Sequence, residues 1–156
     1  MRKWANSFFR WYHKQRFKTI RRYMEHPHEV QSSLLLKQLI QATKHTEWGR
    51  KYGYKSIKNY QTFAERVPVQ TYDSLKPYIK RMMYGEKDVL WSGQVSWFSK
   101  SSGTTGDKSK FIPVTRQNLK QCHIRGAWDT MTLFYQNRSD ARQFEFKSML
   151  MGGSLE

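Results

Sequence analysis

The sequence of 156 residues has a single cysteine, Cys122, and no long apolar run. One cysteine excludes an intramolecular disulfide, and a reducing compartment fits that composition. No run approaches the roughly 20 apolar residues that a membrane-spanning helix needs. The N-terminus also lacks the apolar core and the small-residue cleavage site of a secretory signal. These absences favour a cytoplasmic protein.

Acidic residues are scarce as well. The chain has 12 Asp and Glu against 28 Lys and Arg, which gives a formal net charge of +16. Such an excess suits nucleic acid, an anionic membrane or a polyanionic ligand. Eight of the basic residues, and no acidic one, lie within residues 1–22.

Residues 1–25 are predicted to be a separate basic and aromatic segment, helical from residue 3. Its proposed apolar face consists of Trp4, Phe8, Trp11 (or Tyr12) and Gln15, continued less regularly by Phe17, Ile20 and Met24. This face could pack on the rest of the protein. It could also lie on an anionic membrane, where basic and aromatic faces act together, or contact nucleic acid.

Residues 26–156 carry signals for a mixture of helices and short strands. Pro27 suits a first helical turn, and an apolar stripe follows to about Lys44. The other predicted elements are a loop at 46–54, a helix at 59–66, a helix that Thr71 caps and Gly85 ends, an extended segment at 88–98, a strand at 110–113, a helix at 115–135, a loop at 136–140 and a strand at 148–151. In the last helix we expect the inward residues to be Leu119, Cys122, Trp128, Met131 and Phe134.

The most informative stretch lies between the two central extended segments. It is Ser101-Ser102-Gly103-Thr104-Thr105-Gly106, followed by Lys108 and Lys110. Glycines allow a tight turn and a close approach of the backbone to a ligand. Hydroxyl and backbone N–H groups can then surround one anion, with lysine nearby. The pattern predicts a phosphate-binding loop between two strands, although a Ser/Thr/Gly run can also be a flexible surface loop.

Two common phosphate loops do not fit. A Walker A loop needs Gly, four residues, Gly, Lys and Ser or Thr, and no such run starts at Gly103. A dinucleotide fingerprint needs three glycines that open directly into a helix. Here an apolar segment, Phe111-Ile112, follows instead.

The loop resembles the first nucleotide-binding motif of the adenylate-forming superfamily, which includes acyl-CoA synthetases and luciferases. The lysine stands one residue later than in most members, and no proline precedes it. That offset, with Lys110 followed by Phe111-Ile112-Pro113-Val114-Thr115, is similar to the acyl acid–amido synthetases of the auxin-responsive promoter family. The flanks resemble this family too, at Thr46-Glu47-Trp48-Gly49 to Tyr54, Tyr60 to Val69, Tyr72, Leu75 to Ile79 and Gly85-Glu86.

The resemblance implies a ligase that activates a carboxylic acid with ATP as an acyl-adenylate and then forms an amide with an amine or amino acid. It implies Mg²⁺ on the ATP phosphates, and Lys110 as the catalytic motif lysine. The implied ATP-binding residues are Ser101, Ser102, Gly103, Thr104, Thr105, Gly106 and Lys110. No residue of the chain is expected to ligate a metal directly.

The resemblance also implies a fold class and a domain organisation. We expect an α/β, helix-rich N-terminal part of an adenylate-forming large domain of the bacterial type. Residues 26–156 would be the N-terminal portion of that domain, incomplete and inactive without the C-terminal part of the same protein. The alternative is a basic nucleic-acid-binding or peripheral-membrane module without catalysis.

Overall fold

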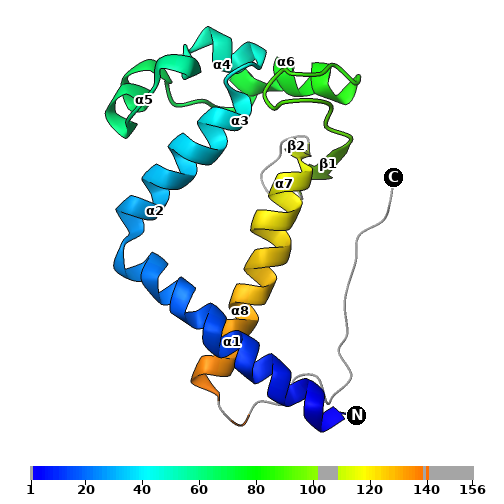
Figure 1. Ribbon diagram of the computed structural model, residues 1–156. Coiled ribbons are helices and arrows are strands. Elements are labelled where there is room, and N and C mark those ends of the chain that lie inside the picture. Colours follow the sequence, from blue (N-terminus) through cyan, green and yellow to red (C-terminus); the bar gives the residue numbers. More distant parts are fainter. Residues whose placement is uncertain (1, 102–108, 139, 141–156) are drawn as a thin grey trace. The chain divides into compact units, whose positions relative to one another are not determined.

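A computed structural model describes residues 2–101, 109–138 and 140, with side chains from residue 7 onward (Figure 1). The chain divides into two compact units, Met1–Glu25 with Ile124–Glu156, and His26–His123. Over the described residues helices dominate, and two short strands form one antiparallel sheet. This helix-rich mixture agrees with the predicted α/β class. No described helix is long and apolar enough to cross a bilayer.

The first unit packs helix α1 (Arg2–Glu25) against helix α8 (Arg125–Asn137). Among the α1 side chains that the structure describes, from residue 7 onward, the buried ones are His13 and Ile20, which lie seven positions apart on one helical face. His13 Nδ1 lies 2.7 Å from the Thr132 hydroxyl. Arg16 donates two hydrogen bonds to Asp129, at 2.7 and 2.8 Å. The long basic helix is thus held by polar contacts as well as apolar ones.

The predicted packing face of α1 is partly wrong. Ile20 is buried and Phe17 half-buried, but the side chains of Phe8 and Trp11 are 60% and 59% exposed and Met24 is 70% exposed. The face that meets α8 runs through His13, a polar residue that an aromatic periodicity does not select. Its ring stacks on Tyr135 of α8, with the ring centroids 5.2 Å apart.

The second unit opens with one continuous helical run. It consists of α2 (Pro27–Ser33), the π-helical segment η1 (Leu34–Ile40) and α3 (Gln41–Thr43). Pro27 occupies the first turn, where its missing N–H leaves no intrahelical bond unmade. The predicted helix to about Lys44 is confirmed in extent, whereas its π-helical middle was not predicted.

The predicted loop at 46–54 is wrong, because it contains helix α4 (Glu47–Lys51) and the 3₁₀ turn η2 (Tyr54–Ser56). Thr46 caps α4, and its hydroxyl accepts a hydrogen bond from Gly49 N at 3.0 Å. A Cβ at Gly49 would lie 2.1 Å from the Thr43 carbonyl oxygen. The glycine is therefore required by close packing inside a helix and does not mark a loop.

Two capped helices follow as predicted. Helix α5 (Tyr60–Arg66) is capped by Asn59, and helix α6 (Tyr72–Met83) by Thr71. Thr71 and Ser74 form a reciprocal capping box at the start of α6. Gly85 has a φ of 88°, the left-handed conformation that glycine supplies after a helix end.

An ion-pair network joins α4 to α6. The guanidinium of Arg81 donates to both carboxylate oxygens of Glu47, at 2.6 and 3.1 Å, and also to Glu86. These bonds raise the pKa of Arg81 and lower the pKa of each glutamate. At neutral pH all three groups are charged, so the network stabilises the position of α6.

The segment 88–98, predicted to be extended, is mostly irregular. Asp88 accepts a hydrogen bond from Gly93 N at 2.7 Å and closes a tight turn, and both residues have positive φ. The backbone carbonyls of Asp88 and Val89 accept hydrogen bonds from the first N–H groups of α4. Only the end of the segment 88–98 belongs to a strand, β1 (Trp97–Lys100), which pairs with β2 (Phe111–Val114).

The helical region after Thr115 is confirmed, as α7 (Arg116–Asn118), the π-helical segment η3 (Leu119–Ile124) and α8. Its predicted inward face is partly wrong. Leu119 and Met131 are half-buried, but Cys122, Trp128 and Phe134 are exposed. The buried positions are Thr132 and Tyr135, which face α1. The predicted strand at 148–151 lies outside the described residues.

Candidate functional site

The two strands predicted on either side of the Ser/Thr/Gly motif are present. Strands β1 and β2 lie side by side (Figure 1) and are antiparallel. Lys100 lies opposite Phe111, and Trp97 lies opposite Val114. Eight residues, 102–109, connect Ser101 to Lys110. Five of the predicted ATP-binding residues lie outside the described residues, namely Ser102, Gly103, Thr104, Thr105 and Gly106.

The structure brings the other two predicted site residues together. Ser101 N donates to the Lys110 carbonyl at 2.9 Å, and Lys110 N donates to the Ser101 hydroxyl oxygen at 3.0 Å. This pair closes the mouth of the hairpin loop. The Ser101 hydroxyl keeps its own proton and a second lone pair, so it can still donate to an anion.

Contacts from helix α6 hold the Lys110 end of the hairpin loop in place. Phe111 N donates to the Tyr72 hydroxyl at 2.9 Å, and this bond lies outside the strand ladder. The Lys110 ammonium lies over the Tyr72 ring, 5.5 Å from its centroid. Tyr72 is the first residue of α6, directly after its cap Thr71.

Tyr72 is a residue of the site for which no role was predicted from the sequence. It stands among the flanking positions on which the predicted resemblance to amido synthetases rests, and this was the available signal. The structure shows its two contacts, a hydrogen bond to the backbone of the strand and a ring beneath the lysine. An attractive cation–π contact of this kind limits the positions that the flexible lysine chain adopts.

The Lys110 side chain is exposed, and it extends from the residue whose backbone N–H donates to the Ser101 hydroxyl at the hairpin mouth. Lysine donates up to three hydrogen bonds and accepts none, which suits the oxygen atoms of a phosphate group. Within the described ranges, no group of three or more His, Cys, Asp or Glu residues could hold a metal ion. The geometry therefore fits recognition of an oxyanion by hydroxyl and ammonium donors.

Comparisons with known proteins identify the family of the chain. A family model described as "GH3 family N-terminal domain" matches residues 16–152. The chain is 35% identical over 79 residues to the jasmonoyl–L-amino acid synthetase JAR6 of Nicotiana attenuata, covering 50% of this chain and 14% of that protein. It is 34% identical over 89 residues to the indole-3-acetic acid-amido synthetase GH3.17 of Arabidopsis thaliana, covering 56% of this chain and 15% of that protein.

Solved structures resemble the fold as well. The structure titled "AtGH3.15 acyl acid amido synthetase in complex with 2,4-DB" superposes with a TM-score of 0.61 at 31% identity, covering 69% of this chain. The chain spans 14% to 19% of the length of these relatives. The predicted resemblance to acyl acid–amido synthetases is confirmed at the level of the family, while the bacterial type stays a prediction. The chain belongs to the GH3 family, and the region that matches is that family's N-terminal domain.

Proposed function

We propose that this protein is an ATP-dependent acyl acid–amido synthetase. In the first step a carboxylate oxygen attacks the α-phosphorus of ATP, and the bond to the β-phosphate breaks to release pyrophosphate. In the second step an amine nitrogen attacks the acyl carbon, loses a proton and displaces AMP. The proposal is supported by membership of the GH3 family and by relatives whose names describe amido synthetases.

Within this reaction we assign the segment from Ser101 to Lys110 to the ATP phosphates. Charge moves onto the β- and γ-phosphate oxygens as pyrophosphate departs, and donors fixed beforehand stabilise that charge best. Lys110 supplies the positive charge and Ser101 a hydroxyl donor. The observation that carries this assignment is the hairpin closure, which places the two residues side by side while α6 holds the lysine.

The remaining donors are proposed from the motif alone. They are the hydroxyls of Ser102, Thr104 and Thr105 and the backbone N–H groups that Gly103 and Gly106 leave accessible. Mg²⁺ would bind through the phosphate oxygens of ATP, as is usual for that ion. Residues that recognise adenine, ribose, the acyl acid and the amine are not assigned to any position of this chain.

MgATP binding tests the assignment. We expect Lys110→Ala to weaken binding by about tenfold in isothermal titration, since a charge-assisted hydrogen bond contributes roughly 1.5–3 kcal/mol. Lys58→Ala is the matched control, because Lys58 is an exposed lysine of the same unit that lies outside the hairpin. Equal effects of the two substitutions would show that only the overall positive charge matters, and would refute the assigned role of Lys110.

A further inference from the structure

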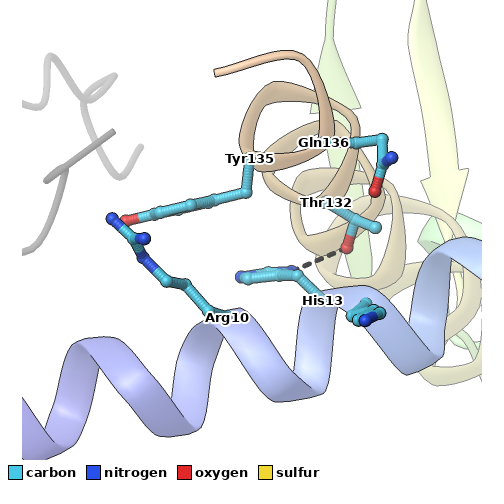
Figure 2. Close-up of a pocket in the computed structure, with 6 residues that line it drawn as sticks. Arg10, His13, Thr132, Tyr135 and Gln136 are labelled. Atoms are coloured by element: carbon cyan, nitrogen blue, oxygen red, sulfur yellow. Dashed lines mark hydrogen bonds between the residues drawn. The ribbon is translucent and has the colours of Figure 1, made fainter. Parts of the chain in front are cut away.

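A cavity lies between α1 and α8, and none of its residues belongs to the Ser101–Lys110 segment. Its volume is about 270 Å³, several times the roughly 30 Å³ share of one liquid water. Figure 2 shows that α1 contributes its basic side and α8 its hydroxyl and amide groups. The lining residues are Arg10, His13, Lys14, Thr132, Tyr135 and Gln136.

The tautomer of His13 follows from its contacts. The Thr132 hydroxyl donates to the Trp128 carbonyl at 2.9 Å, so its oxygen is left to accept from His13 Nδ1 at 2.7 Å. Nδ1 therefore carries the proton. In the neutral ring Nε2 is then an acceptor with a lone pair. Burial lowers the pKa of His13, which favours this neutral form.

His13 Nε2 is the unusual atom of the cavity. The residue is 2% exposed, and Nε2 has no hydrogen-bond partner among the residues that the structure describes. Figure 2 shows this end of the ring directed into the space between Arg10 and Tyr135. A buried polar atom without a partner costs free energy that a bound donor would recover.

The charges around His13 Nε2 indicate which kind of ligand could donate a hydrogen bond to it. Arg10 and Lys14 are the charged lining residues, and neither nearby acid lines the cavity. Asp129 is held by Arg16 on the same interface, and Asp140 interacts with Arg10 and Arg138. The rings of Tyr12 and Tyr135 lie beside the His13 ring. A ligand must therefore accept from two cations and donate to one imidazole nitrogen.

We propose that this cavity binds a phosphomonoester group in its singly protonated form. Its unprotonated oxygens accept from Arg10 and Lys14, and its P–OH group donates to His13 Nε2. A phosphomonoester has a second pKa near 6, so this form makes up about half of the population at pH 6. A carboxylate or a sulfate offers the acceptors but lacks the proton. The group can belong to a soluble molecule or to a lipid headgroup.

Titration of the full 156-residue chain with inorganic phosphate and with sulfate at pH 6 tests the proposal. We expect phosphate to bind about tenfold more tightly than sulfate, because only phosphate brings a donor for Nε2. The His13 ring signals in NMR should shift with phosphate and saturate. Equal affinity for the two anions, or an unmoved His13 signal, would overturn the proposal.

Two substitutions in α1 make a matched pair. Lys14→Gln should weaken phosphate binding about tenfold, whereas Lys18→Gln, at an exposed position outside the cavity, should change it less than about twofold. Equal losses would mean diffuse attraction to the basic helix and would overturn the site. Circular dichroism of each variant checks that α1 is still folded.

Vesicles separate the two sources of the phosphate group. Phosphatidic acid carries a phosphomonoester, whereas phosphatidylglycerol carries a phosphodiester without that proton. Sedimentation with phosphatidic acid vesicles alone, lost in Lys14→Gln, would identify a lipid headgroup. Binding of phosphate without vesicle binding would identify a soluble ligand. Equal sedimentation with both vesicles, unaffected by Lys14→Gln, would overturn the site.

Discussion

Replacing Tyr72 by phenylalanine removes one hydroxyl from the candidate nucleotide site and leaves the aromatic ring in place. That hydroxyl accepts the Phe111 N–H at 2.9 Å, outside the ladder between β1 and β2. A hydrogen bond of this kind contributes about 1 kcal/mol net, which corresponds to roughly a fivefold change in an opening equilibrium. We therefore expect the Phe111 amide to exchange with solvent about five times faster in Tyr72→Phe.

Amide hydrogen exchange followed by NMR measures this effect residue by residue. The Ser101 amide is an internal control, because it donates to the Lys110 carbonyl inside the hairpin and should change less. Tyr84→Phe is the matched variant, since Tyr84 follows the same helix and is 91% exposed. Unchanged exchange at Phe111 would refute the anchoring role of Tyr72.

A graded series extends the test to the lysine. Tyr72→Leu removes the ring under the Lys110 ammonium as well as the hydroxyl, at a further cost of about 0.5–1 kcal/mol. MgATP affinity should then fall in the order wild type, Tyr72→Phe, Tyr72→Leu. If the leucine variant binds MgATP as the wild type does, the ring does not position Lys110.

Two further predictions concern stability. Gly49→Ala should destabilise the protein by about 3 kcal/mol, because the new Cβ meets the Thr43 carbonyl. Gly126→Ala in α8 meets nothing within 4 Å and should stabilise the protein by about 0.5–1 kcal/mol. Thermal unfolding compares the two variants, and equal shifts in melting temperature would contradict the packing argument. The hydrogen bonds from Arg81 hold the pKa of Glu47 below its usual 4.5. The contribution of Glu47 to the free energy of unfolding is therefore present above pH 4.5 and is lost as the pH falls further. Glu47→Gln should flatten the loss of stability in acid below pH 4.5, and an unchanged acid profile would show that this ion pair contributes nothing.

The features that the sequence predicted well are those with local signals. Pro27 at a first turn, Thr71 as a cap and Gly85 after a helix end depend on neighbours within a few residues, and all three are confirmed. The hairpin at Ser101 and Lys110 was predicted for the same reason. Apolar segments flank a run of turn-forming and hydroxyl residues there.

The features that were missed depend on distant partners. Gly49 disfavours a helix by propensity, yet the carbonyl of Thr43 leaves no room for a side chain there. His13 faces α8 because it pairs with Thr132, 119 positions away. Tyr72 reaches Phe111 across 39 positions. Periodicity within one helix carries no information about such partners.

Exchange of labelled pyrophosphate into ATP that depends on an added carboxylic acid tests the proposed function most directly. Exchange requires reversible formation of an acyl-adenylate, so we predict it for the full-length gene product with at least one acid of a panel that includes indole-3-acetic and jasmonic acids. Lys110→Ala should reduce the exchange rate and Lys58→Ala should not. Absence of exchange with every acid, or exchange equal in both variants, would contradict the assignment of the Ser101–Lys110 segment to adenylate formation.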